Sequence, residues 1–242
     1  MTALLRASGL SKSFRGLKAV ANASFEVAEG QVSALIGPNG AGKTTVFNLI
    51  AGVYAPDTGT IHFQGRPIHG LRPDQICAAG IGRTFQLVKP FPALSVLDNV
   101  IVGALRVERT VAAARGAAHA VLRKLGLEAR ANDPAATLTL SDRKRLEVAR
   151  ALATRPRLLL LDEVMAGLRP TECDQLVEAF RGLHRAEGLT ILLIEHVMRA
   201  VMALAQHIAV LDRGAVIARG TPDEVVRDMA VVQCYLGEDT EI

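Results

Sequence analysis

The sequence lacks several features that would point to particular classes of protein. Half of the 242 residues are hydrophobic, yet no run of 18 apolar residues occurs, so the sequence predicts no membrane-spanning helix. Residues 1–6 show no signal-peptide pattern, and we therefore expect the protein in the cytoplasm. Aromatic residues make up only 4% and the arginines are scattered. The net charge of +4 therefore favours a solvated basic surface over a nucleic-acid interface.

Cysteine is also scarce. Cys77, Cys173 and Cys234 are odd in number and lack the spacing of metal ligands, so we interpret them as ordinary reduced thiols. No internal repeat or low-complexity tract is evident apart from alanine enrichment in 112–120. A chain of this length can bury a substantial core, as one domain or as a domain with a subdomain.

A glycine-rich segment lies between the apolar run 32–36, a predicted strand, and residues 46–50, which repeat with helical spacing. This segment matches G-x-x-x-x-G-K-[ST] in the strand–turn–helix context of a phosphate-binding loop. Glycines let successive N–H groups point at an anion, and the helix opening at Gly42 adds partial positive charge. The sequence therefore predicts that a nucleoside triphosphate binds here, with a plain glycine turn as the alternative. The predicted nucleotide-binding residues are Gly37, Pro38, Asn39, Gly40, Ala41, Gly42, Lys43, Thr44 and Thr45.

Four leucines at 158–161 predict a buried parallel strand, which ends abruptly in Asp162 and Glu163. Acids at the carboxyl end of such a strand lie where α/β folds place their ligands. In nucleotide chemistry, Lys43 would reach the β- and γ-phosphates and Thr44 would hold Mg²⁺. Asp162 would hold Mg²⁺ through water, and Glu163 would polarise the attacking water. The alternative is a capped strand end with solvated acids.

Three further residues are candidates with weaker individual signals. His196 follows a third apolar strand, 190–194, which favours a role near the γ-phosphate over that of an ordinary surface histidine. Phe14 lies in a predicted turn and is either a core residue or a platform for a purine base. Gln86 ends a short predicted strand, 81–86, and its residue type alone indicates no role.

The remaining pattern predicts strands at both ends of the chain and helices between them. Ser141 or Asp142 is expected to cap the last helix of the middle region, and 221–224 reads as a capping box. The predicted strands are 3–9, 18–28, 60–63, 208–211 and 215–218, and the predicted helices are 96–105, 111–125, 142–154 and 171–187.

Together these motifs resemble an ATP-binding-cassette (ABC) ATPase over essentially the whole chain. Residues 37–45 resemble the Walker A loop and 158–162 the Walker B strand, followed by Glu163 as the catalytic carboxylate. Gln86 matches the Q-loop glutamine, His196 the switch histidine and Phe14 the aromatic that stacks on adenine. The resemblance implies ATP and Mg²⁺ as cofactors, with Glu163, His196, Gln86 and Lys43 in catalysis and Thr44, Gln86 and Asp162 at the metal.

The resemblance also implies the architecture. We expect a single α/β P-loop ABC ATPase domain over 1–242, with a RecA-like core, an N-terminal antiparallel β-subdomain and an inserted α-helical subdomain. Residues 1–86 and 157–242 would form the catalytic core with the β-subdomain, and 87–156 the helical subdomain.

Finer features resemble the ATP-binding subunits of branched-chain amino acid importers. They are Arg83-Thr84-Phe85-Gln86, Ala166-Gly167-Leu168, Glu195-His196-Val197-Met198 and Tyr235-Leu236-Gly237-Glu238. This likeness implies a peripheral protein on the inner face of the cell membrane that couples ATP hydrolysis to transport through separate permease subunits. The permeases would contact the region from Gln86 to Val100, and this chain would touch neither the cargo nor nucleic acid. The alternative is a non-transport ABC ATPase, either one that acts in nucleic-acid maintenance or a regulatory ATP-binding cassette.

The sequence departs from the family at the signature L-S-G-G-Q, which reads Leu138-Thr139-Leu140-Ser141-Asp142 when aligned by Arg145, Ala149, Arg150 and Leu152. Thr139 keeps a hydroxyl, and Thr139 and Ser141 are the candidate nucleotide contacts of this segment. The lost glycines limit backbone approach, and the Asp142 carboxylate would repel phosphate. Arg169 replaces the usual D-loop aspartate or asparagine, and Val164 replaces a common proline. The phosphate-binding loop and the acids at 162–163 are intact, whereas the signature is not. This asymmetry between the two halves of the site favours a heterodimer with a paralogous cassette over a homodimer.

Overall fold

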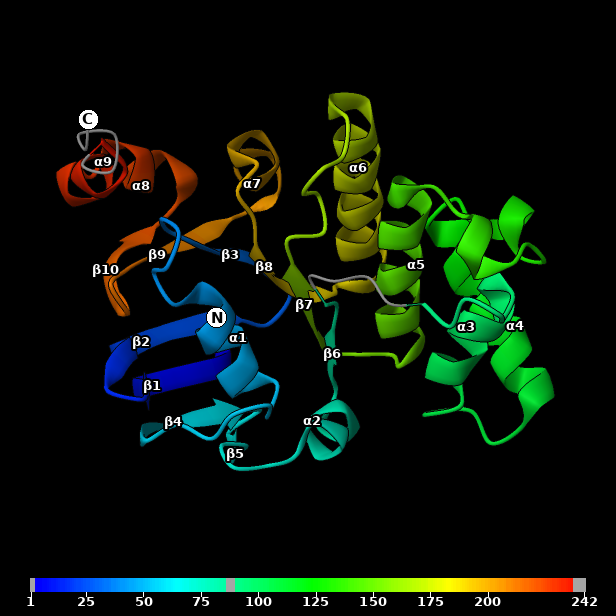
Figure 1. Ribbon diagram of the computed structural model, residues 1–242, viewed down its shortest axis with the longest axis horizontal. Helices are drawn as coiled ribbons and strands as arrows, with labels where there is room; N and C mark the ends of the chain where they lie inside the picture. Colours follow the sequence, from blue (N-terminus) through cyan, green and yellow to red (C-terminus); the bar gives the residue numbers. More distant parts are fainter. Residues whose placement is uncertain (1–2, 86–89, 237–242) are drawn as a thin grey trace. The chain divides into compact units, whose positions relative to one another are not determined.

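The computed structural model describes residues 3–85 and 90–236. The chain divides into two compact units, Met1–Ile76 with Thr190–Ile242, and Cys77–Leu189 (Figure 1). Each unit has its own strands and helices, and each carries part of the predicted site.

The first unit contains an antiparallel sheet with strand order β2-β1-β4-β5. Strands β1 (Ala3–Phe14) and β2 (Leu17–Ala28) form a hairpin around Arg15 and Gly16, and β4 (Thr58–Phe63) and β5 (Arg66–Pro67) continue the sheet. Strand β1 runs five residues beyond the predicted 3–9, because its second half pairs with β2 as far as Phe14 opposite Leu17. The expected N-terminal antiparallel β-subdomain is confirmed.

The first unit also contains the strands that carry the glycine-rich loop. Strand β3 (Val32–Ile36) lies between β8 (Thr190–Ile194) and β9 (His207–Asp212), parallel to both, and β10 (Ala215–Gly220) closes a hairpin with β9. Every residue of β3 and β8 is buried, as expected of central parallel strands. The accompanying helices are α1 (Lys43–Ile50), α7 (Met198–Leu204), α8 (Pro222–Arg227) and α9 (Met229–Leu236).

The predicted capping box at the start of α8 is confirmed. The Thr221 N–H donates to the Glu224 carboxylate at 2.7 Å, and the Glu224 N–H donates to the Thr221 hydroxyl at 3.4 Å. Each residue thus satisfies an N–H group that the first turn of a helix leaves without a partner.

The second unit combines a parallel strand pair with a group of helices. Strand β6 (Ile81–Arg83) pairs with β7 (Leu158–Asp162), with Ile81 opposite Leu158. Helices α3 and α5 pack closely, since a Cβ on Gly103 would lie 2.5 Å from the Arg150 carbonyl oxygen. The helices are α3 (Val96–Ala104), α4 (Val111–Lys124), α5 (Leu140–Ala153) and α6 (Pro170–Glu187), with 3-10 turns at Glu128–Arg130 and Ala135–Thr137; α2 (Pro73–Ala79) spans the sequence boundary between the units. This unit is larger than the helical subdomain expected at 87–156, whose boundaries stay a prediction.

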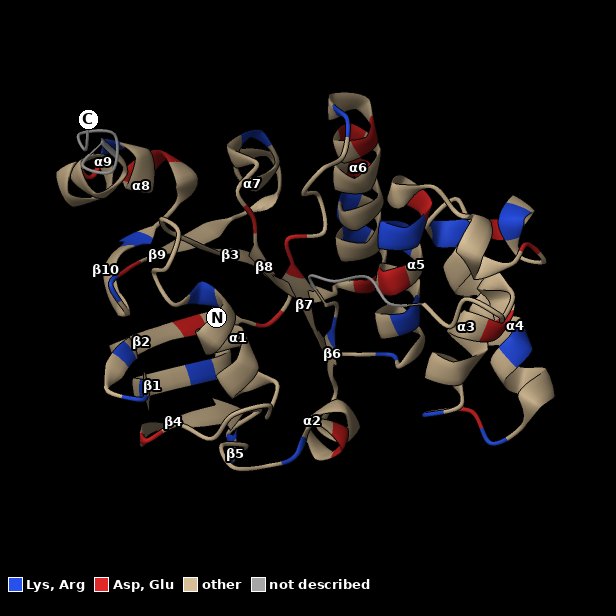
Figure 2. Cartoon of the chain, viewed as in Figure 1, with Lys and Arg blue, Asp and Glu red and all other residues tan. Residues whose placement is uncertain are grey.

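Charged residues are distributed over both units. Figure 2 shows basic and acidic positions interspersed along α5 and α6 and scattered over the strands. Within residues 3–85 and 90–236, no helix is both long and apolar enough to cross a bilayer.

Candidate functional site

The glycine-rich loop connects buried β3 to the start of α1. Gly37 has φ +147° and Gly42 has φ +101°, both in the region that favours glycine. A Cβ at Gly37 would lie 1.9 Å from the Leu211 carbonyl oxygen, and one at Gly42 would lie 2.3 Å from the Ala19 carbonyl oxygen. The loop is therefore closely packed against β9 and β2 and admits no side chain at these two positions.

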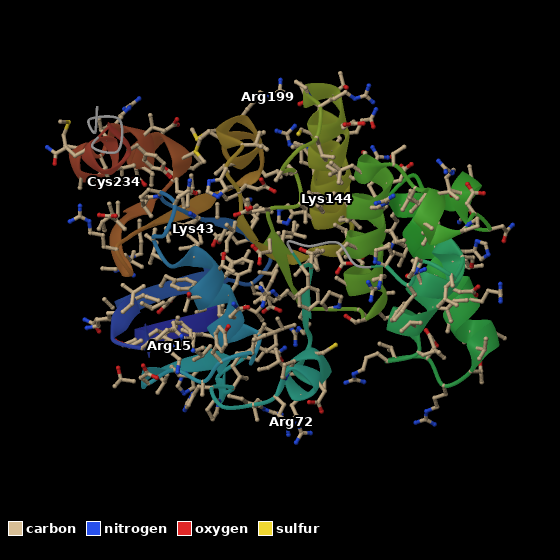
Figure 3. All side chains as sticks on the ribbon, in the orientation of Figure 1. Arg15, Lys43, Arg72, Lys144, Arg199 and Cys234 are labelled. Carbon is tan, nitrogen blue, oxygen red and sulfur yellow. The ribbon has the colours of Figure 1, made fainter. Side chains whose placement is uncertain are left out.

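Lys43 is the first residue of α1 and is labelled in Figure 3. Only 6% of it is exposed, and its Nζ donates to the carbonyl oxygens of Gly37 at 2.7 Å and Pro38 at 2.8 Å. The Lys43 ammonium group is thus hydrogen-bonded to the main chain at the start of the loop that precedes it. Thr44 beside it is exposed, as are Asn39 and Gly40 at the tip. A single loop therefore brings all nine predicted phosphate-binding residues together, and α1 directs its first-turn N–H groups to the same place.

Phe14 ends β1 and is 37% exposed, so it is not the core residue that one of its two interpretations required. Its ring meets that of Tyr54 edge to face, with centroids 5.1 Å apart. Lys12 lies 5.7 Å from the Phe14 ring centre and is paired with Asp57 at 2.7 Å. Asp57 also accepts the Ser13 N–H, so this end of the hairpin is fixed. Phe14 and Tyr54 together offer an exposed aromatic surface of the kind on which a base stacks.

His196 lies in the same unit as the glycine-rich loop, two residues after the end of β8. Glu195 before it is only 2% exposed, whereas His196 is exposed. The imidazole is therefore presented at the carboxyl end of a buried parallel strand, where α/β folds bind ligands.

Asp162 ends β7 in the second unit and is 1% exposed. Its Oδ2 accepts a hydrogen bond from the Arg83 guanidinium at 2.9 Å, whereas its buried Oδ1 accepts none from the described residues. Burial raises the pKa of the Asp162 carboxyl, and Arg83 opposes that shift. A buried carboxylate oxygen that accepts no hydrogen bond suits a hard cation such as Mg²⁺, which binds oxygen ligands.

Glu163 has the left-handed backbone conformation, with φ +50°. For a residue with a Cβ this conformation costs on the order of 1–2 kcal/mol, and such strain is common at active sites. Its carbonyl oxygen accepts a hydrogen bond from Lys144 Nζ at 2.9 Å. Val164 and Met165, which follow it, are buried, and Glu163 itself is half-buried.

The predicted strand 81–86 is too long. Strand β6 ends at Arg83, where its pairing with β7 also ends, and Gln86 lies outside the described residues. Thr84 still fastens the chain to β7, because its hydroxyl accepts the Asp162 N–H at 3.0 Å and its N–H donates to the Leu160 carbonyl at 2.9 Å. The segment before Gln86 is therefore tied to the strand that carries Asp162.

The signature segment begins α5, and its cap differs from the prediction. Thr139 is the N-cap, with its hydroxyl accepting the Asp142 N–H at 3.2 Å, whereas Ser141 and Asp142 lie inside the helix. The helix begins at Leu140 because an acceptor at Thr139 reaches the third following N–H. Ser141 is 6% exposed, and Asp142 pairs with Arg130 at 3.3 Å.

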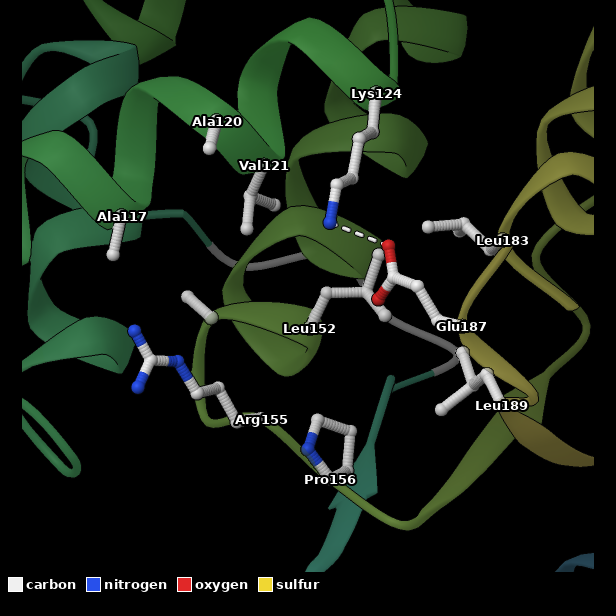
Figure 4. Close-up of a pocket in the computed structure, with 11 residues that line it drawn as sticks. Ala117, Ala120, Val121, Lys124, Leu152, Arg155, Pro156, Leu183, Glu187 and Leu189 are labelled. Atoms are coloured by element: carbon white, nitrogen blue, oxygen red, sulfur yellow. Dashed lines mark hydrogen bonds and ion pairs between the residues drawn. The ribbon is translucent and has the colours of Figure 1, made fainter.

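A cavity of about 360 Å³ lies in the second unit among α4, α5 and α6 (Figure 4). Its walls are partly apolar and partly polar, and its Lys124 and Glu187 pair with each other. It contains none of the predicted site residues.

Comparison with known proteins decides the family. The ABC transporter family model matches residues 20–166, more than half of the chain. The chain belongs to the ABC transporter family. A second model, described as a branched-chain amino acid ATP-binding cassette transporter, matches residues 215–241 of this cassette.

Two relatives align along nearly their whole length. The cassette is 41% identical to the high-affinity branched-chain amino acid transport ATP-binding protein LivG of Salmonella typhimurium, covering 97% of this chain and 98% of the relative. It is 40% identical to the corresponding protein BraF of Pseudomonas aeruginosa, with the same coverage. Among solved structures, an ATP-binding cassette of an ABC transporter in its ADP conformation has 30% identity and a TM-score of 0.88, covering 98% of this chain and all of that one. The predicted family, the ABC ATPase fold and the class of enzyme, an ATPase, are confirmed.

Several residues that shape this cassette were not anticipated from the sequence. Arg83 pairs with Asp162, and Glu147 of α5 is buried with its carboxylate bonded to the Phe85 N–H and to Arg150. Lys144 lies in the basic run 143–145, which resembles a solvated helix face. No sequence signal marks Arg83, Glu147 or Lys144 as buried, because each also contacts a segment distant in the sequence.

Proposed function

We propose that this cassette is the ATP-binding and hydrolysing subunit of an ABC importer for branched-chain amino acids or related small polar solutes. The observation that carries the proposal is the glycine-rich loop, packed too closely for any side chain at Gly37 and fixed around buried Lys43. The full-length likeness to LivG and BraF and the match of 215–241 support the transport role and the solute class.

In this function the loop N–H groups and Lys43 bind the β- and γ-phosphates and stabilise charge on the transferring group. Glu163 polarises the attacking water, and His196 holds the γ-phosphate. Phe14, with Tyr54 beside it, stacks on the adenine. These groups bind, orient and polarise, which is what phosphoryl transfer demands of a protein.

Mg²⁺ would neutralise charge on the phosphates when bound. Thr44, Gln86 and Asp162 would hold it, and the buried Asp162 Oδ1, which accepts no hydrogen bond from the described residues, supports that assignment. Arg83 fixes the other oxygen of the same carboxylate and thereby orients it.

The proposed assembly pairs this cassette with a second one, and we favour a paralogous partner over a second copy. Thr139 and Ser141 of the eroded signature would face the partner's nucleotide. Permease subunits would contact the region from Gln86 to Val100, which places the protein on the cytoplasmic face of the membrane. Neither nucleic acid nor the transported solute would contact this chain.

The test combines hydrolysis with transport. The cassette is co-purified with its membrane subunits, reconstituted in vesicles, and assayed for ATP hydrolysis and for leucine uptake. Glu163→Gln should abolish most of both activities. Glu187→Gln, which alters an exposed pair in the same unit, is the matched control and should leave them unchanged. Hydrolysis without solute uptake would support a non-transport cassette, and full activity in Glu163→Gln would refute the assigned chemistry.

A further inference from the structure

Lys144 is a buried lysine in a place where the sequence suggests a solvated one. It is 6% exposed on α5, where Figure 3 labels it, and its Nζ donates to the Glu163 main-chain carbonyl at 2.9 Å. Burying an ammonium group is unfavourable unless it is hydrogen-bonded. The hydrogen bond to the Glu163 carbonyl therefore offsets the cost of burying this ammonium group.

The two neighbouring basic residues have different partners. Arg143 donates to the Leu138 carbonyl at 2.9 Å, two residues before α5 begins, and Arg145 donates to Gln175 at 2.5 Å. Lys144, by contrast, donates to the main chain that follows β7. Leu140, one turn earlier on α5, also lies against that segment, with Cδ2 3.4 Å from a Cβ built on Gly167. The first part of helix α5 thus contacts the segment 163–167 at both ends of that segment, at Glu163 and at Gly167.

The residue that Lys144 contacts is the one with the unfavourable backbone. Glu163 has φ +50°, a conformation that persists only where the surrounding structure holds it. A charged donor on the Glu163 carbonyl fixes the orientation of that peptide group, and with it the direction in which the side chain leaves the backbone.

We propose that Lys144 is a positioning residue for ATP hydrolysis, which holds Glu163 in the left-handed conformation that aims its carboxylate at the attacking water. The inference rests on the proposed function, in which Glu163 polarises that water. In this role Lys144 acts through its hydrogen bond to the main chain of Glu163. Its loss therefore changes the rate of the chemical step and leaves nucleotide affinity intact.

The first test compares Lys144→Met, Lys144→Arg and the exposed control Lys124→Met in the complete transporter. Methionine keeps the length and apolar stem but removes the donor. Because an error of about 1 Å in a reacting group costs on the order of 100-fold in rate, we expect Lys144→Met to lower kcat by about 10- to 100-fold. The KM for ATP should change less than about twofold, and Lys144→Arg should restore most of kcat because it keeps a charged donor. Lys124→Met should match the wild type.

The second test asks whether Lys144 acts through Glu163. Single-turnover hydrolysis is measured in Glu163→Gln with and without Lys144→Met. Residues that act as a unit are non-additive, so the second substitution should change the residual rate less than about twofold. An equal loss of rate in both backgrounds, or a wild-type kcat in Lys144→Met, would overturn the inference.

The outcomes separate this inference from the proposed function. If Glu163→Gln alone leaves hydrolysis intact, the proposed function fails before Lys144 is considered. If Glu163→Gln is inactive and Lys144→Met is fully active, only the role of Lys144 is refuted. Should Lys144→Met not fold, Lys144→Gln takes its place, and it should lower kcat relative to Lys144→Arg at unchanged KM.

Discussion

Replacing Gly37 by alanine tests whether the glycine-rich loop is packed as the structure shows. An added Cβ would lie 1.9 Å from the Leu211 carbonyl oxygen and 3.0 Å from its carbonyl carbon, so β9 or the loop must move by an ångström or more. The backbone at φ +147° also disfavours any residue with a Cβ. Adding about 1–3 kcal/mol for overpacking to about 1–2 kcal/mol for the backbone gives about 2–5 kcal/mol of lost stability.

Gly40→Ala is the matched control within the same loop. Its φ is +76°, but no atom lies within 4 Å of an added Cβ, so only the backbone term of about 1–2 kcal/mol applies. Urea denaturation should therefore give a smaller loss of stability for Gly40→Ala than for Gly37→Ala. In a domain of this size, 3 kcal/mol corresponds to a fall in Tm of about 6–12 °C.

Nucleotide binding provides the second measurement of this pair. Titration calorimetry with ATP and magnesium should show weak or no binding for Gly37→Ala, because displacing the carbonyl oxygens of Gly37 and Pro38 also displaces Lys43. If Gly37→Ala is as stable as Gly40→Ala and binds ATP as the wild type does, the reasoning about the loop is wrong.

Three further substitutions test other parts of the structure. Asn99→Ala should lower stability by about 3 kcal/mol in urea denaturation, because Asn99 is fully buried and its amide bonds both the N–H and the carbonyl of Phe91; wild-type stability would contradict this. Thr221→Ala should cost about 1 kcal/mol by removing the cap of α8, and Thr221→Ser should restore it. Burial raises the pKa of the Glu147 carboxyl above 4.5, so the folded state keeps that proton longer than the unfolded state, and stability contributed by this group falls as pH rises through the raised pKa. The stability of Glu147→Gln relative to the wild type should therefore increase from pH 4 to pH 7, and a flat difference would refute the assignment.

The sequence predicted most reliably what depends on neighbouring residues. The glycine-rich loop, the capping box at 221–224 and the strand 190–194 are each specified by a continuous run of residues. The observed β8 has the predicted bounds of that strand. The resemblance to a family rested on the same local motifs. The comparisons with known proteins confirm that family and its fold.

Errors occurred where several residues competed for one role. Thr139, Ser141 and Asp142 are all good N-caps, and propensity alone cannot choose among them. Packing decided, because Ser141 is buried within α5 and Thr139 is left at its end. Strand β6 was predicted too long for a different reason, since its end is set by pairing with β7 rather than by its own residues.

Buried polar partners could not be predicted at all. Lys144 and Glu147 lie on α5 in a stretch rich in charge, a pattern that is typical of a solvated helix face. Their burial follows from contacts with Glu163 and Phe85, which are 19 and 62 positions away in the chain (163 − 144 and 147 − 85). A pattern of residues along one helix contains no information about such distant partners.

The structure also changes how the unusual signature is understood. The carboxylate of Asp142 lies in the first turn of α5, where the helix dipole favours an acid, and its pairing with Arg130 offsets the charge that a neighbouring phosphate would meet. Thr139 uses its hydroxyl oxygen as an acceptor for the Asp142 N–H, and a hydroxyl that accepts in this way can still donate its proton to a phosphate oxygen. Capping and phosphate binding by Thr139 are thus compatible, so loss of the two glycines, rather than the acid, is the departure that most limits what this segment offers a partner's nucleotide.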